Sequence, residues 1–111
     1  MIDRTDSFYT TVPAKGCVVK DQVPAKGVTW EIVRFVGSAA YSATTTVKLV
    51  WDSGGPEEEV IASTHGEANV ELLRHVVGNG IKKLALVLVN TSAELQTIGG
   101  RCEARELDGG S

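Results

Sequence analysis

The stretch TTTVKLVWDSGGP, residues 44–56, indicates the fold most directly. Four side chains suited to a buried face stand at alternate positions: Thr45, Val47, Leu49 and Trp51. Most of the residues between them are polar. Successive side chains of a strand point to opposite faces, so this pattern is typical of a half-buried antiparallel strand. The next residues, Asp52-Ser53-Gly54-Gly55-Pro56, favour a turn or loop. We therefore expect one strand of an antiparallel sheet with a loop after it.

Apolar runs of strand length recur on both sides of this stretch, from Gly16 to Glu106, and end at Gly, Pro, Asn or Asp. The most continuous run, Ile81–Asn90, is expected at the centre of the core. The alternation changes parity after Ile32, which favours a bulge or a strand covered on both faces. The last run, Leu95–Glu106, is broken by Gly99-Gly100, as in a bent or edge strand. Seven or eight strands predict an all-β, antiparallel, jelly-roll-like β-sandwich.

Residues 68–77 fit two structures. Val70, Leu73 and Val77 have helical spacing, whereas Val70 and Leu72 alternate as in a strand. Because the turn signal Gly78-Asn79-Gly80 follows, we favour a short strand and a loop.

The sequence Val-Pro-Ala-Lys-Gly occurs twice, at residues 12–16 and 23–27. In each copy Pro can fix the first corner of a turn and Gly its exit. An eleven-residue spacing is too short for a repeat unit, so we interpret the two copies as the same turn used twice.

With 111 residues, the chain has room for one domain and one core. Residues 1–15 are polar and are predicted to form an extended N-terminal arm with four apolar anchors: Ile2, Phe8, Tyr9 and Val12. Residues 16–107 are the predicted sandwich, and residues 108–111 are a flexible C-terminal tail. Cys17 and Cys102 lie in the first and last strong strands, so a disulfide is geometrically possible. We favour two free thiols, because no secretory signal precedes them.

Charge and hydropathy argue against two classes of partner. The chain has 11 basic and 14 acidic residues and a formal charge of −3, which gives a phosphate-binding surface little to build on. The N-terminal residues are polar, and the longest strongly apolar run, Leu84–Val89, is far shorter than the ~20 residues that span a bilayer. We expect a soluble protein made in the cytosol, with neither nucleic acid nor a membrane as its partner.

Residues suited to catalysis or metal binding are scattered. Ser63 or Thr64 beside His65 lacks a nucleophile elbow, and side chains one or two positions apart on a strand are poorly placed for proton relay. His75 does not join His65 in a metal-ligand spacing. Three glutamates in a row, Glu57–Glu59, are typical of a solvated loop rather than of paired catalytic carboxylates. We therefore expect no enzyme, and we assign no catalytic, cofactor-binding or metal-binding residue.

Four aromatic residues suggest a sugar-binding surface as an alternative: Trp30, Phe35, Tyr41 and Trp51. Sandwich modules that bind carbohydrate present aromatic rings to pyranose rings. Because aromatic residues make up only 5% of the chain, we expect the two tryptophans in the core.

Three stretches carry a family resemblance: Val28–Arg34, Val47–Asp52 and Gly80–Leu84. Together with the small all-β chain and the predicted arm, they resemble the jelly-roll decoration, or cement, proteins of tailed bacteriophages. Such proteins bind the outside of the capsid across contacts between major capsid subunits. They need no cofactor and no catalytic residue.

The resemblance implies a structural virion protein that is made in the host cytoplasm and staples neighbouring major capsid subunits. It implies a homo-oligomer, a dimer or trimer, on the capsid surface. Contacts are expected from the arm and from acidic loop residues: Ile2, Phe8, Tyr9, Val12, Asp52, Glu57, Glu58 and Glu59. The alternative is a carbohydrate-binding module, for example a phage tail or fibre domain.

Overall fold

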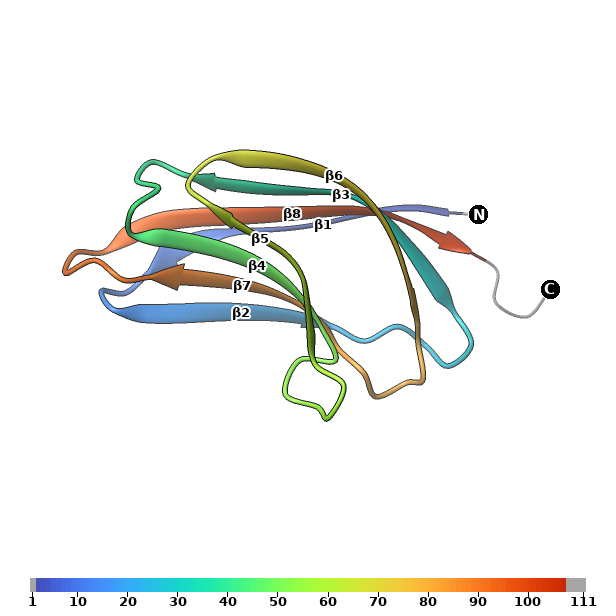
Figure 1. Ribbon diagram of the computed structural model, residues 1–111. Coiled ribbons are helices and arrows are strands. Elements are labelled where there is room, and N and C mark those ends of the chain that lie inside the picture. The colour runs from blue at the N-terminus through green and yellow to red at the C-terminus, as the bar shows by residue number, and fades with distance from the viewer. Residues whose placement is uncertain (1, 108–111) are drawn as a thin grey trace.

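The computed structural model describes residues 2–107, and these form eight strands in two four-stranded antiparallel sheets (Figure 1). The strands are β1 Ile2–Val12, β2 Gly16–Gln22, β3 Thr29–Ala39, β4 Thr45–Trp51, β5 Glu59–His65, β6 Ala68–Val77, β7 Leu84–Asn90 and β8 Gln96–Leu107. One sheet has the order β1-β8-β3-β6 and the other β2-β7-β4-β5. Strands 1 and 8, 2 and 7, 3 and 6, and 4 and 5 are hydrogen-bonded neighbours, so the chain is a long hairpin wound on itself. This is a jelly roll, and the predicted fold class is confirmed.

The core lies between the sheets and is centred on β4 and β7. Alternate residues of β4 point inward as predicted, and the run Leu84–Asn90 is an internal strand. Large side chains from both sheets are fully or almost fully buried there: Ile32, Phe35, Val47, Leu49, Leu86 and Leu88. Complete burial of one such side chain contributes about 1.5–3 kcal/mol to folding.

The predicted bulge in β3 is confirmed, and so is the choice of a strand over a helix for β6, although β6 is longer than the predicted short strand. The register of β3 shifts between Ile32 and Arg34 against both of its neighbours, which is the predicted bulge. Residues 68–77 form a strand over their full length, because the alternating pattern places Val70 opposite Phe35 and Val76 opposite Trp30. A helix would not provide these pairings with β3.

The predicted N-terminal arm is not confirmed. Ile2–Val12 form β1, an edge strand that pairs with β8 along its whole length, from Ile2 opposite Glu106 to Val12 opposite Gln96. Of the two predicted forms of the last run, a bent or an edge strand, the edge strand is wrong for the same reason, because β8 lies between β1 and β3. The described residues therefore form one sandwich, and the predicted tail, 108–111, lies outside them.

The two Val-Pro-Ala-Lys-Gly segments are both turns, but they are not the same turn. In the first, the Gly16 amide donates to the Pro13 carbonyl, and Lys15 has a φ of 53°. In the second, the Val28 amide donates to the Ala25 carbonyl, and Gly27 has a φ of 85°. The hydrogen-bonded turn is thus shifted by one residue relative to the repeat, and a different residue takes the left-handed conformation.

Both cysteines are free thiols. Cys17 is exposed on β2, whereas Cys102 is buried in β8 of the other sheet. Burial raises the pKa of the Cys102 thiol to about 12, so this thiol is chemically inert in the folded protein. None of the residues from 2 to 107 forms a helix long and apolar enough to cross a bilayer.

Candidate functional site

The residues considered for catalysis do not come together. His65 is the last residue of β5 rather than a loop residue, and its Nδ1 lies 3.3 Å from both the Thr45 carbonyl oxygen and Thr46 Oγ1. His75 is in β6 of the other sheet, where its Nε2 lies 2.9 Å from Glu31 Oε2. Within the described part of the chain, no group of three or more His, Cys, Asp or Glu side chains is arranged to hold a metal ion.

The acidic residues between β4 and β5 have separate partners within the chain. Asp52 is buried with a φ of 54°, and its carboxylate accepts the amide of Glu57 at 2.9 Å. Glu58 accepts the Gly54 amide at 2.8 Å, and Glu59 forms an ion pair with a β6 arginine. The four carboxylates build and brace the loop instead of facing one another. Asp52 is therefore a loop-organising residue rather than an exposed contact.

Glu57 forms an ion pair with Lys82 in the loop before β7. The hydrogen bond from Lys82 lowers the pKa of Glu57, and the same bond raises the pKa of Lys82. Both groups are solvent-exposed, so the pair fixes the position of the loop more than it stabilises the fold.

The predicted contact residues in the N-terminal segment have different surroundings. Val12 is completely buried in the core, so it is not a surface contact. Phe8 is half-buried against the core, whereas Tyr9 is 69% exposed. Alternate residues of β1 face inward, which separates these neighbours. The side chain of Ile2 lies outside the described part of the structure.

Both tryptophans are buried, as expected. Trp30 Nε1 donates to Glu106 Oε1 at 2.9 Å, and the Arg4 guanidinium lies 4.2 Å from the centre of the Trp30 ring. Trp51 is 7% exposed and belongs to the core. A sugar platform made of these rings is therefore wrong, and the exposed aromatic side chains among the described residues are Tyr9 and Tyr41.

The outer face of the β1-β8-β3-β6 sheet is cross-linked by ion pairs. Glu31 of β3 lies 3.2 Å from Arg105 of β8 and 2.9 Å from His75 of β6. Arg34 of β3 lies 3.4 Å from Glu71 and 3.7 Å from Glu103. Opposite charges on neighbouring strands thus pair directly on this face, although Tyr9, Leu73 and Val77 are also exposed on it.

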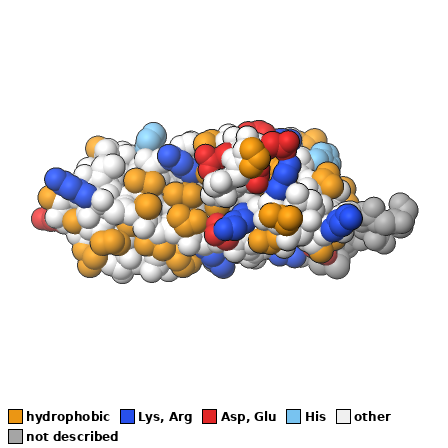
Figure 2. All heavy atoms as spheres, turned by 90° about the horizontal axis from the view of Figure 1, so that it is seen from below, with side chains coloured by type: hydrophobic (Ala, Val, Ile, Leu, Met, Phe, Trp, Pro, Cys, Tyr) orange, Lys and Arg blue, Asp and Glu red, His pale blue; other side chains and the backbone are white. Residues whose placement is uncertain are grey.

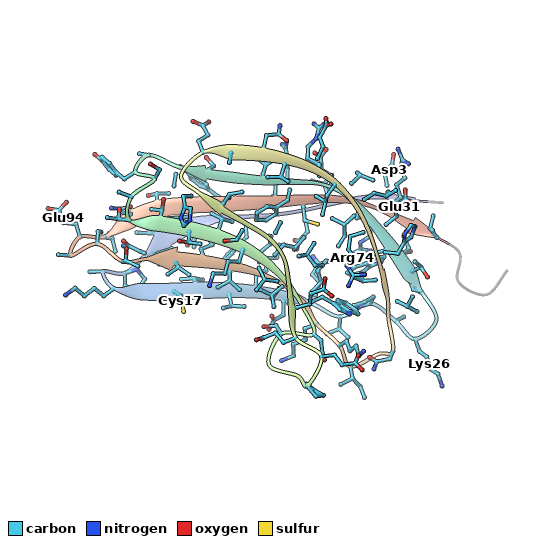
Figure 3. All side chains as sticks on the ribbon, viewed as in Figure 1. Asp3, Cys17, Lys26, Glu31, Arg74 and Glu94 are labelled. Atoms are coloured by element: carbon cyan, nitrogen blue, oxygen red, sulfur yellow. The ribbon has the colours of Figure 1, made fainter. Side chains whose placement is uncertain are left out.

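The outer face of the β2-β7-β4-β5 sheet carries an apolar patch beside the polar side chains of Thr46, Ser63 and His65, and we call this patch the valine face. It consists of Cys17, Val19, Val60, Val87 and Val89. Val19 pairs with Val87, and Cys17 with Val89, in the β2–β7 register. Val19 and Val60 are 46% and 53% exposed, and Val87 and Val89 are half-buried. Cys17 points away from the sandwich (Figure 3), and hydrophobic side chains gather over one half of the surface seen from below (Figure 2).

Lys48 of β4 lies within the valine face, opposite Val87 of β7 and Ser63 of β5. Among residues 2–107, the ion pairs found do not include Lys48. At the β2 edge, Asp21 Oδ2 lies 3.9 Å from Lys83 Nζ. The valine face is therefore an apolar surface with a cation inside it and charged groups at its rim.

Sequence reasoning missed the valine face, although one signal for it was present. The run Leu84–Val89 is apolar at both parities, and an antiparallel strand with one wet face alternates instead. Its inward residues, Leu86 and Leu88, build the core, and Val87 and Val89 lie on the outer face. A strand with two apolar faces in an antiparallel sheet indicates a second contact surface.

Comparisons with known proteins identify a similar fold but no family. No family model and no curated protein matches this chain. Among solved structures, the mitogen derived from Yersinia pseudotuberculosis is similar over 99% of this chain and 93% of its own, with a TM-score of 0.62 and 12% identity. At this identity the likeness shows the β-sandwich fold alone.

Two further solved structures are similar at lower scores. A periplasmic inhibitor of g-type lysozyme from Aeromonas hydrophila has a TM-score of 0.46 and 9% identity, over 93% of this chain and 86% of the inhibitor. A protein of the disulfide-linked pili on Bacillus endospores has a TM-score of 0.45 and 10% identity, over 92% of this chain and 87% of its own.

Proposed function

We propose that this chain is a structural, non-enzymatic virion protein that binds the outside of a tailed-phage capsid and staples neighbouring major capsid subunits. The observation that carries the proposal is the valine face. The resemblance of the sequence to phage decoration proteins supports a major capsid protein as the partner. The proposed contact surface is the outer face of the β2-β7-β4-β5 sheet instead of the predicted arm, because the arm is an edge strand of the sandwich.

The valine face has the properties of a protein contact surface. Val19 and Val60 leave apolar surface in water that a partner would cover, at about 25 cal/mol for each Å² removed from water. Val50 and Ala85 form a buried floor between them, so the surface is a continuous part of the sheet. A contiguous apolar patch with a polar rim is typical of protein interaction sites.

Lys48 indicates which chemical group the partner must provide. Lys48 stands between Val87 and Ser63 in the register, so a partner that covers the valine face must provide an acceptor for its ammonium group. We expect an apolar patch with a carboxylate on the capsid subunit. The exposed glutamates Glu57 and Glu58 of the β4–β5 loop, and Glu59 at the start of β5, border the valine face because Glu59 precedes Val60, and they stay candidates for contacts at its edge.

Cys17 provides a direct test, because it is the exposed thiol of the chain and belongs to the valine face. The purified protein is labelled at Cys17 with a bulky maleimide and mixed with expanded phage capsids stripped of accessory proteins. The matched control is a Cys17→Ser, Leu73→Cys variant labelled with the same reagent, because Leu73 is 70% exposed on the other sheet. We expect saturable binding of the unlabelled protein and of the labelled control, and loss of binding after labelling at Cys17.

Two outcomes would contradict the proposal. If the unlabelled protein does not bind the capsids, the chain is not a decoration protein. If the label at Cys17 leaves capsid binding intact, the valine face is not the contact. A protein that does not bind capsids can still form an oligomer that a Val19→Lys, Val60→Lys variant converts to a monomer. That result would assign the valine face to contacts between copies of this chain.

A further inference from the structure

A second surface of the molecule, far from the valine face in the fold, carries the two exposed tyrosines. Two adjoining hollows of about 320 Å³ and 410 Å³ share Tyr9, Ser38 and Glu67 as lining residues. The first extends over β8 to Arg101, and the second extends to Tyr41 and Gln96. Together they form a groove on the β1-β8-β3-β6 side, at the end of the sandwich where β3 ends and β8 begins. Each hollow lies in the usual size range of small-molecule sites, roughly 300–1,000 Å³.

We infer that this tyrosine groove binds a short neutral glycan, with pyranose rings stacked on Tyr9 and Tyr41. The inference goes beyond capsid binding and uses none of the residues of the valine face. It rests on the placement of the two rings, on the glycine against the edge of one of them and on the polar groups between them.

One edge of the Tyr9 ring lies against a glycine in the neighbouring strand. Tyr9 of β1 lies opposite Gly99 of β8, and a Cβ added at Gly99 would be 2.3 Å from Tyr9 Cδ2 and 3.3 Å from its Cγ. The Cδ2 edge of the ring therefore packs against the Gly99 backbone at a distance that no other residue permits. Because Tyr9 is 69% exposed, the rest of the ring faces solvent. A pyranose stacks on such a supported ring at little cost in side-chain entropy.

Tyr41 supplies the second ring from a loop that is fixed at its backbone. Thr45 Oγ1 donates to the Tyr41 carbonyl at 2.6 Å, and the Thr44 amide donates to the same oxygen at 3.4 Å. The side chain of Tyr41 is 64% exposed. An exposed aromatic residue on a fixed backbone is suited to binding because the loop does not have to be ordered when the ligand arrives.

The polar lining favours a neutral, hydroxyl-rich ligand. Glu67 and Arg101 line the same hollow with opposite charges, so the groove has no excess charge that selects an ion. Ser38 and Thr97 add hydroxyl groups, and Gln96 adds an amide whose Nε2 donates to Thr44 Oγ1 at 3.1 Å. Among the described residues, Glu67 makes no ion pair, so its carboxylate is open to sugar hydroxyl donors.

The test is a glycan array probed with the folded protein, followed by calorimetric titration of the glycan that binds best. Tyr9→Ala should weaken binding about tenfold or more, because removing a central aromatic contact typically costs over 1 kcal/mol. Gly99→Ala should also weaken it, since the new methyl group displaces the ring while both tyrosines stay in the chain. Tyr9→Phe should retain most of the affinity, and Leu73→Ala, outside the groove, should retain all of it. Thermal unfolding of each variant checks that it is folded.

Several results would overturn the inference. No neutral glycan bound by the folded protein would do so, as would affinity unchanged by Tyr9→Ala. Binding confined to sulfated or sialylated glycans would assign recognition to Arg101 instead of the tyrosines. Capsid binding lost in Tyr9→Ala would make Tyr9 a capsid contact, whereas capsid binding kept in a variant that has lost the glycan separates the two surfaces.

Discussion

The two outer faces of this sandwich are built by the same alternation of side chains, yet their cross-strand pairs differ, being charged on one face and apolar on the other. On the β1-β8-β3-β6 sheet, Glu31 sits between Arg105 and His75 on the neighbouring strands, so the charges find partners within the chain. On the β2-β7-β4-β5 sheet, Val19 sits beside Val87 and both stay partly in water. Cross-strand pairs of either kind contribute about 0.2–1 kcal/mol. The difference is that the valine face joins apolar side chains across neighbouring strands where the other face joins charged ones, and this makes it the candidate contact surface.

The largest expected effect belongs to the core that both faces cover. Phe35→Ala should lower the free energy of unfolding by about 3–5 kcal/mol, because the side chain is fully buried and its removal leaves a cavity. Urea unfolding followed by tryptophan fluorescence measures the change. Leu73→Ala, on an outer face, should stay within about 0.5 kcal/mol. If the two variants cost the same, the division between core and outer faces is wrong.

The buried thiol predicts a large effect at high pH. Burial raises the pKa of Cys102 from an ordinary value of 9.0 to about 12. Between these values the unfolded chain loses the thiol proton while the folded chain keeps it, so stability falls as the pH rises through this window. The loss reaches about 4 kcal/mol once the pH passes the folded pKa. Unfolding free energies of the wild type and Cys102→Ala, compared from neutral to alkaline pH, should converge or cross.

The reactivities of the two thiols, Cys17 and Cys102, should differ because one lies on the valine face and the other in the core. Cys17 should react with a thiol reagent at neutral pH in the folded protein, whereas Cys102 should react only after unfolding. A count of modified thiols before and after denaturation measures this. Two reactive thiols in the folded protein would contradict the placement of Cys102, and none would contradict the exposure of the valine face.

Local patterns predicted most of the fold, because inward residues repeat every second position wherever a strand crosses the middle of the core. The clean alternation at residues 45–51 and the change of parity at Ile32 both appear in the structure. The edge strand β1 was missed because its inward positions are partly polar. Arg4 lies on the Trp30 ring and Asp6 pairs with Lys20 at 2.8 Å, so partners from distant strands stabilise groups that look solvent-exposed in the sequence.

The candidate surfaces were harder to predict than the fold, because each is assembled by pairing between distant segments. Val19 and Val87 stand 68 positions apart in the sequence and become neighbours only through the β2–β7 register. Tyr9 meets Gly99 through the β1–β8 register in the same way. Alternation states which side a residue faces, but it does not state which residue lies beside it on the next strand.

The smallest expected effect compares the two outer faces directly. Glu31→Gln removes the ion pair with Arg105 and changes the contact with His75, and it should lower the free energy of unfolding by about 0.5–1 kcal/mol at low salt. High salt should shrink this loss, because it screens charges at the surface. Urea unfolding at two ionic strengths measures both values.

Val19→Thr provides the matched change on the valine face, because it replaces half-exposed apolar surface with a hydroxyl group of similar shape. Its effect should stay within about 0.5 kcal/mol and should be the same at both ionic strengths. A salt-dependent loss for Glu31→Gln together with a salt-independent result for Val19→Thr supports one electrostatically satisfied face and one apolar face. If both variants respond alike to salt, the two faces do not differ in this way, and the reason for choosing the valine face as the contact surface fails.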